Sequence, residues 1–327
     1  MIVSAPITSD ALKIDAAETV ERIGRGLREI AFRQLRRKGV VVGLSGGIDS
    51  SVVAYLCAKA LGADHVIGLC MPEADSSPHS LRLGREVGAA LGIRVFVEDI
   101  AGILEAAGCY RRRDEAIGSV VPEYTKGWKA KIVLPDLVGG ARYALFSVVV
   151  RSPAGGERTV RLPLDAYLGI VAATNFKQRT RKMMEYYYAD RFNFGVAGTP
   201  NRLEHDQGFF VKNGDGAADV KPIAHLYKSQ VYQLAAWLGV PHEIQSRPPT
   251  TDTYSLEQSQ EEFYFALSLE ATDLCLFAKN HQLPPSDVAD AVQLTPEQVE
   301  RMYRMIDARR AAARYLHAAP ILLEPLA

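Results

Sequence analysis

Strand-like and helix-like patterns alternate along the N-terminal third of the chain. The continuous β-branched run at 40–44 and the apolar run at 65–71 are typical of strands buried on both faces, and IRVFVEDI at 93–100 predicts a third strand. Helical patterns lie before and between these strands, at 16–38, 52–62 and 80–91. This alternation predicts an α/β fold whose doubly wound, mostly parallel sheet is flanked by helices.

The alternation breaks after Gly108. Residues 141–164 read as two strands around a Gly/Pro turn, which predicts a β-hairpin within an insertion at 111–165. The pattern leaves two roles open for this insertion: a cover for the site, or a contact between subunits.

Helical character returns at 166–190, and 192–198 predicts another strand. Residues 228–239 carry an apolar stripe at i, i+3, i+4 and i+7, which is typical of a helix packed on a core. Near the end, TPEQ at 295–298 offers an N-cap, a first-turn proline and a capping box, so a helix should run from there to about Leu316. We expect one domain over 1–327, with 280–327 as a helical C-terminal segment.

Composition narrows the class of protein. The 327 residues are 48% hydrophobic and 23% charged, as in an ordinary globular enzyme. Lys plus Arg and Asp plus Glu both equal 38, and this zero formal charge argues against a nucleic-acid partner. The run Arg111–Arg113 reads as a solvated surface rather than a binding site.

Cysteine spacing and hydropathy indicate the compartment. The four cysteines form no CxxC pair, which fits neither a disulfide framework nor a zinc site and suggests reduced thiols. No long apolar leader is visible at the start, and charges or Gly/Pro interrupt every apolar run short of membrane-spanning length. We therefore expect a cytoplasmic enzyme without a membrane partner.

The segment SGGIDSS at 45–51 combines a strand end, two glycines, an aspartate and three serines. Glycines let the backbone approach a phosphate, and the N–H groups and dipole of the following helix favour an anion. Asp49 is unfavourable beside a phosphate unless a divalent cation lies between them, so the loop predicts Mg-nucleotide binding. The alternative is an ordinary Gly-rich strand-to-helix turn. The expected ATP contacts here are Leu44, Ser45, Gly46, Gly47, Asp49, Ser50 and Ser51.

This loop is neither GxxxxGK[ST] nor GxGxxG. SGGxDS resembles the pyrophosphate loop of the N-type ATP pyrophosphatases. The resemblance implies an adenine nucleotide alpha hydrolase-like fold and cleavage of ATP to AMP and pyrophosphate. A substrate carboxylate or carbonyl is adenylated, and a nucleophile then displaces AMP. The motif indicates this class but not the substrate.

A second segment, AGTPNRLEHDQGFFVKNGDGAADVKPIAHLYKSQV at 197–231, resembles the signature of the NAD synthetase family. GT-x-N, E, GFF-x-K, GDG-x-x-D and a later Lys occur there in the family's order. The resemblance implies ammonia-dependent amidation of deamido-NAD, with ATP and magnesium as further reactants and a homodimer as the assembly. The implied contacts are Thr199 and Lys228 to ATP, Glu204 with Asp49 to magnesium, and Lys212 with Asp219 to deamido-NAD.

Shorter segments extend the resemblance. NFKQRTRKM at 175–183 is similar to the family's N-x-x-x-R-x-R-M helix, which implies substrate contacts from Asn175 and Arg179. MPEADSSPHSL and RPPT resemble segments that bring Met71 and Thr250 to ATP. The catalytic residues implied are Asp49, Lys228 and Asp219, the last as the carboxylate that takes a proton from ammonia.

The chain departs from the family pattern mainly in the segments that would bind the acid substrate rather than ATP. The Asp of the family's Q-x-D-E stretch is not in place near Gln258, and the terminal His-Lys pair is replaced, if at all, by Arg309, Arg310 or His317. These differences leave open a rival, an AMP-forming amide synthetase for another carboxylate. Sulfur transfer to tRNA and nucleotide binding without catalysis are weaker alternatives.

Ammonia and three residues remain to be placed. No glutamine-hydrolysing domain is recognisable, so the nitrogen is expected as free ammonia or from a separate protein. His205, His225 and Asp206 match no role in the family and are expected to be structural.

Overall fold

The computed structural model describes residues 7–133, 146–248, 254–256 and 267–324. Its centre is a four-stranded parallel sheet in the order β3-β2-β1-β7, which confirms the α/β fold class. The strands are β1 (Val40–Gly43), β2 (Val66–Cys70), β3 (Arg94–Val97) and β7 (Gly195–Ala197). Strand β1 is central, since Val40 pairs with Val66 of β2 on one side and with Gly195 of β7 on the other.

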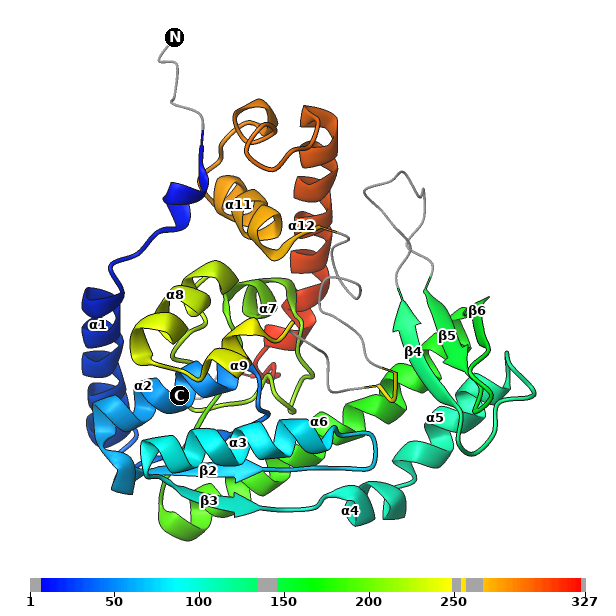
Figure 1. The fold of residues 1–327 in the computed structure, drawn as a ribbon, viewed down its shortest axis with the longest axis horizontal. Coiled ribbons are helices and arrows are strands. Elements are labelled where there is room, and N and C mark those ends of the chain that lie inside the picture. Colours follow the sequence, from blue (N-terminus) through cyan, green and yellow to red (C-terminus); the bar gives the residue numbers. More distant parts are fainter. Residues whose placement is uncertain (1–6, 134–145, 249–253, 257–266, 325–327) are drawn as a thin grey trace.

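Helices cover both faces of this sheet (Figure 1). One side carries α1 (Ala16–Arg28), α2 (Ile48–Leu61), α3 (Pro78–Leu91) and α8 (Lys228–Leu238). The other carries α4 (Ala101–Ala106), α5 (Cys109–Gly118) and the long α6 (Leu164–Phe192). Short 3-10 helices lie at Ser9–Leu12, Ala63–His65 and Pro285–Asp287.

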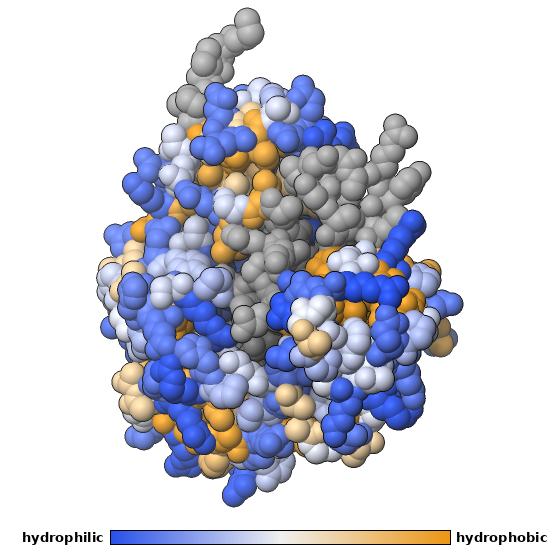
Figure 2. Space-filling view, turned by 45° about the vertical axis from the view of Figure 1, so that its right-hand side comes forward, coloured by the Kyte–Doolittle hydropathy of each residue, from blue (hydrophilic) through white to orange (hydrophobic). Residues whose placement is uncertain are grey.

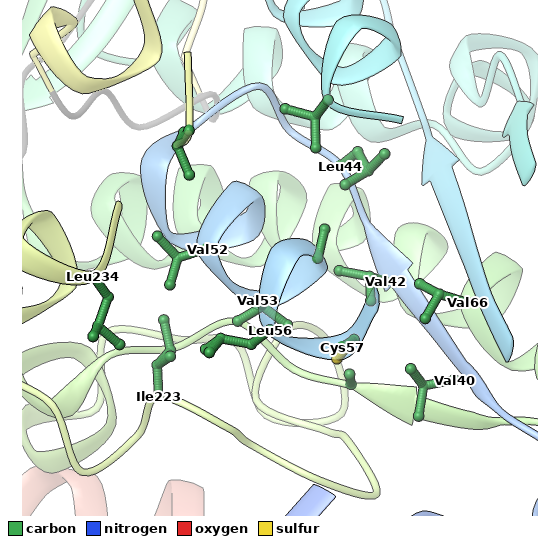
Figure 3. Packing of buried hydrophobic residues seen from close by; sticks show 14 of the residues in the cluster. Val40, Val42, Leu44, Val52, Val53, Leu56, Cys57, Val66, Ile223 and Leu234 are labelled. Carbon is green, nitrogen blue, oxygen red and sulfur yellow. The ribbon is translucent and has the colours of Figure 1, made fainter. Parts of the chain in front are cut away.

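The all-apolar sequence of β1 follows from its central position. Val40 and Val42 point into the core formed with α2 and α8, as the close-up in Figure 3 shows. Val41 packs into the opposite core, against α6. A strand that is buried on both faces has no position for a polar side chain.

The predicted N-terminal helix is interrupted before its expected end. After Arg28 the helix widens into a π-helix over Glu29–Gln34, and Arg36 then takes a left-handed conformation with φ 51°. The helical segment at 16–38 is therefore confirmed in position, but it stops four residues early.

The insertion holds more structure than a hairpin. Strands β4 (Lys129–Val133), β5 (Ser147–Arg151) and β6 (Glu157–Arg161) form an antiparallel sheet in that order. The β5–β6 hairpin is confirmed, whereas β4 and the helix α5, which begins just before the insertion, were not predicted. This small sheet lies beside α5 and α6 (Figure 1) and has its own core.

The expectation that Arg111–Arg113 is simply a solvated surface is wrong for one residue. Arg113 is buried, and its guanidinium lies 2.5 Å from the Asp75 carboxylate. Lys177 of α6 is fully buried and donates to the same aspartate at 2.7 Å and to Glu73 at 3.0 Å. The network fastens the segment after β2 to α5 and α6.

A separate helical layer ends the chain. It contains α11 (Leu269–Asn280) and α12 (Pro296–His317), which lie together above the sheet layer in Figure 1. The capping box of α12 is confirmed, because Thr295 accepts from the Gln298 N–H and Gln298 accepts from the Thr295 N–H. The short helix α7 (Arg202–Gln207) packs against α12, whereas the short helix α9 (His242–Ser246) packs against α8 in the core of the sheet region.

The described residues on the face drawn in Figure 2 are mainly hydrophilic. On the face drawn in Figure 2, apolar side chains appear in separate patches among polar ones. Among the helices of the described residues, none has the length and hydropathy that a membrane span requires.

Candidate active site

A large cavity opens at the carboxyl ends of β1 and β2, the edge where parallel sheets bind ligands. Its volume is about 1240 Å³. Its lining residues come from 43–50, 69–81, 146, 167–185, 197–215, 228, 244–248, 254 and 301–316. The cavity thus brings together most of the segments singled out in the sequence.

The loop after β1 is built for an anion. Gly46 has φ +73°, and a Cβ there would lie 2.5 Å from the Ser80 carbonyl oxygen, so only glycine fits. Gly47 precedes α2 without a side-chain cap, which leaves the first N–H groups of the helix for a ligand. The hydroxyl oxygens of Ser45 and Ser50 lie 3.0 Å apart at this end of the cavity.

Not every residue of the loop faces the cavity. Leu44, Ser45, Gly47, Asp49 and Ser50 line it, as do Met71 and Thr199 further along the chain. Gly46 does not, because it is packed against α3. Ser51 does not either, because its buried hydroxyl donates to the Gly47 carbonyl at 2.8 Å.

Lys228 and Asp49 meet at the start of α2. Lys228 is buried, and its ammonium forms an ion pair with the Asp49 carboxylate. Burial alone would lower the pKa of Lys228, but the charges of Asp49 and Glu204 and the hydrogen bond to Asp49 outweigh it and raise the pKa above its ordinary value. The lysine therefore stays charged inside the cavity.

Asn201 joins the two acidic residues of this cluster. Its amide donates to Asp49 at 3.2 Å, and its side chain also accepts from the Glu204 N–H at 3.1 Å. The Glu204 carboxylate accepts in turn from the Asn201 N–H at 3.1 Å, which completes the capping box of α7. Asn201 is fully buried and was not assigned a role from the sequence, although it is the Asn of GT-x-N.

Asp49 and Glu204 are suited to bind Mg²⁺ together with substrate phosphates, rather than a metal ion bound by protein ligands alone. Asp49 and Glu204 both line the cavity and both act on Lys228. No group of three or more His, Cys, Asp or Glu residues that could hold a metal occurs in the described part of the chain. Magnesium commonly uses one or two carboxylates together with substrate phosphates, and the donor set fits that pattern.

Most of the residues expected to bind the acid substrate also line the cavity. Asn175 and Arg179 of α6 and Lys212 are all there. Arg179 donates to the Lys212 carbonyl at 3.3 Å, and the Lys212 ammonium donates to the carbonyl oxygens of Tyr315 and Ala318 at 2.7 and 2.9 Å. Lys212 thereby ties the end of α12 to the cavity wall.

Asp219 lies outside the cavity. Its side chain is exposed and accepts from the Val196 N–H at 2.7 Å and from the Tyr186 hydroxyl at 3.3 Å. Its position gives no support for proton removal from ammonia within this cavity. Asp215, four residues earlier in GDG, does line the cavity, and burial raises its pKa even though the Val211 N–H and Lys182 lower it.

Of the candidates to replace the family's terminal pair, only Arg309 lines the cavity. Arg310 forms an ion pair with Asp206 at 2.8 Å. The His317 ring lies 2.8 Å from the His205 carbonyl oxygen, and burial, together with Lys221 and His317, lowers the pKa of His205 to about 4. Asp206 and His205 thus have structural contacts.

Some expected contacts cannot be located. Thr250 lies outside the described residues, as do the polar residues of the altered segment, Gln258, Gln260, Glu261 and Glu262.

Two features of the cavity wall were missed in the sequence. Lys182 and Glu185, one turn apart on α6, form a buried ion pair that lines the cavity. Phe146, immediately before β5, stacks on Tyr167 with ring centroids 4.0 Å apart, and both line the cavity. In the sequence, the only sign of the ion pair was the i, i+3 spacing of Lys182 and Glu185. The only sign of the stacked rings was an aromatic residue beside the hairpin.

Comparisons with known proteins agree with this arrangement. The family model described as NAD synthase matches residues 19–121 and 165–312, more than half of the chain, and its unmatched gap contains all three strands of the small sheet. The NH(3)-dependent NAD(+) synthetase of Rhizobium rhizogenes is 56% identical over 324 residues, covering 99% of this chain and 98% of that protein. The protein of the same name from Rhizobium meliloti is 58% identical over 319 residues, covering 98% and 95%.

A solved structure supports the architecture. The NMN synthetase of Francisella tularensis superposes with a TM-score of 0.63 and 23% identity, over 95% of this chain and 99% of that one. At this identity the likeness shows the fold alone.

Proposed function

We infer the chemistry of the cavity from one premise: the chain belongs to the NAD synthase family, and it is a ligase with ammonia-dependent NAD(+) synthetase activity that uses ATP. The observation that carries the proposal is the meeting of Lys228, Asp49 and Glu204 at the start of α2. Sulfur transfer to tRNA and binding without catalysis disagree with this family.

The reaction has two bond exchanges. A carboxylate oxygen of deamido-NAD forms a bond to the α-phosphorus of ATP, and the bond from that phosphorus to the bridging oxygen breaks, so pyrophosphate leaves. Ammonia then forms a bond to the acyl carbon, the bond from that carbon to the AMP oxygen breaks, and nitrogen loses a proton. The carboxylate is ionised near pH 7, so the first exchange needs no general base.

The phosphate side of the cavity stabilises the departing pyrophosphate. The N–H groups at the start of α2 and the hydroxyls of Ser45 and Ser50 bind phosphate oxygens. The Lys228 ammonium lies beside them in a buried position, where its charge acts strongly. Asp49 and Glu204 would hold Mg²⁺, which supplies further neutralisation of phosphate charge.

A second group of lining residues would bind the dinucleotide. Asn175, Arg179 and Lys212 would supply the polar and cationic contacts, and Met71, which also lines the cavity, would contact the adenine of ATP. Lys212 would exchange its bonds to the end of α12 for bonds to the substrate. Free ammonia, or ammonia from a separate protein, enters the same cavity.

A second copy of the chain completes our proposal for the assembly. Exposed apolar residues lie along α6, and they are Leu164, Leu168, Met183 and Tyr187. Their exposure supports a helix-to-helix contact between two copies. Asp219 could reach deamido-NAD only in such an assembly, because it lies outside the cavity of its own chain.

The test is a product balance. Purified protein is incubated with ATP, Mg²⁺, ammonium and deamido-NAD, and NAD and AMP are followed by mass spectrometry. Equal formation of both supports the proposal. AMP without NAD, or no reaction until another carboxylate is added, would restore the rival acid.

A further inference from the structure

Among the described residues, two buried lysines line the cavity, and they come from different helices, α8 and α6. Lys228 lies at the start of α8, 1% exposed and paired with Asp49 on the phosphate side. Lys182 lies on α6, 5% exposed and paired with Glu185. Lys228 has a role in binding ATP, whereas the pair on α6 has none so far.

The pair on α6 lies between two parts of the cavity wall, the end of β1 and the loop at 211–215. A Cβ on Gly43, at the end of β1, would lie 2.8 Å from the Glu185 Oε1 atom and 3.6 Å from the Met71 methyl group. On its other side the charge of Lys182 acts on Asp215 and on Lys221. Lys182 therefore stands between the strand end that leads into the phosphate loop and the loop at 211–215.

Stability does not explain this pair. Taking an ammonium and a carboxylate out of water is costly, and well-packed apolar side chains of similar volume often serve as well or better. Glu185 accepts one of the three ammonium protons of Lys182, so the lysine keeps donors for a further oxygen. Both side chains also line the cavity instead of being sealed beneath it.

We propose that Lys182 binds the carboxylate of the acid substrate and that Glu185 holds its ammonium in position. The inference rests on the proposed function, in which that carboxylate must lie beside the α-phosphorus of ATP. A carboxylate placed there needs a cation other than Lys228 near the end of β1, where the partner of Lys182, Glu185, lies. Lys182 is that cation, and Glu185 is a positioning residue.

The decisive variant removes both charges together. Lys182→Met with Glu185→Leu leaves neither a buried ammonium nor a buried carboxylate of this pair unpaired, so it should fold. Loss of a charge-assisted hydrogen bond should lower kcat/KM for deamido-NAD by about 10- to 100-fold. The affinity for ATP with Mg²⁺, measured by calorimetric titration, should change less than about threefold. Glu185→Gln, which keeps the lysine, should lie between this variant and the wild type.

Acid-dependent exchange of labelled pyrophosphate into ATP isolates the adenylation step. The proposal expects the double variant to bind ATP normally and to lose this exchange with deamido-NAD. Exchange and KM for deamido-NAD within threefold of the wild type would overturn it and leave the pair a packing feature. If the wild type itself showed no exchange with deamido-NAD, the proposed function would fail first, and this inference with it.

Discussion

Replacing Asp49 by asparagine tests the phosphate side of the cavity with a change of one charge. Asp49 receives the ammonium of Lys228 and the amide of Asn201, and its side chain is 17% exposed. Asparagine keeps the shape and can still accept a hydrogen bond, but it neither balances the lysine nor binds a cation as a carboxylate does. The variant should therefore fold with reduced stability and lose turnover.

The structure sets the size of both effects. Removing one partner of a buried ion pair costs roughly 3–5 kcal/mol. Here the loss should be smaller, about 1–3 kcal/mol, because Asp49 is partly exposed and Glu204 still acts on Lys228. Turnover should fall on the order of 10³-fold, the scale seen when one preorganised electrostatic contact to a transition state is removed.

Urea unfolding and the rate of NAD formation measure the two effects separately. The matched control is Glu18→Gln, which also removes a carboxylate from the first turn of a helix, but on the exposed side of α1. It should cost no more than about 1 kcal/mol and leave the rate unchanged. An Asp49→Asn protein that forms NAD within tenfold of the wild-type rate would refute the role of this carboxylate.

Three further variants test the fold and its ionisable groups. Gly46→Ala should destabilise the protein and weaken ATP binding, because it adds both a strained φ and a clash with α3. The control Gly92→Ala adds only a strained φ of +64°, so equal losses in unfolding free energy for the two variants would contradict this. Arg113→Ala should lower the free energy of unfolding in urea by about 3 kcal/mol, because it breaks the buried ion pair with Asp75. Arg111→Ala, on the exposed side of α5, should lower it by less than about 1 kcal/mol. Similar losses for the two variants would mean that the buried network is not formed. Burial raises the pKa of Asp273 from 3.8 to about 6, although the Ser229 N–H at the start of α8 lowers it. The protonated Asp273 should therefore stabilise the fold by about 3 kcal/mol below about pH 4, and this stabilisation should be lost as pH rises through 6. Asp273→Asn should flatten this part of the stability profile, and an unchanged slope between pH 4 and 6 would contradict it.

A structural feature could be predicted from the sequence where the residues of a single segment determine it. Val40–Val42 is wholly apolar because both faces of β1 are covered, and the capping box at Thr295 is completed within four residues. The anion loop is equally local, since the left-handed Gly46 and the start of α2 lie within one segment. The parallel sheet and the position of the cavity could be predicted for this reason.

Features that depend on distant partners could not be predicted in this way. Strand β4 alternates lysines with apolar residues and gains its meaning only from pairing with β5. Arg113 is buried because Asp75, far away in the chain, receives it. Asp219 belongs to the motif that indicated the family, yet in one chain its carboxylate is fixed to β7 and not to the cavity.

The measurement that tests the central claim most directly traces the carboxylate oxygens of deamido-NAD into the products. Deamido-NAD carrying two ¹⁸O atoms in its carboxylate is turned over with ATP, Mg²⁺ and ammonium, and the products are weighed by mass spectrometry. If the cavity adenylates this carboxylate, one labelled oxygen appears in AMP and the other in the amide of NAD, and pyrophosphate carries none. Label in pyrophosphate, or unlabelled AMP formed alongside NAD, would contradict attack at the α-phosphorus and with it the account of this site.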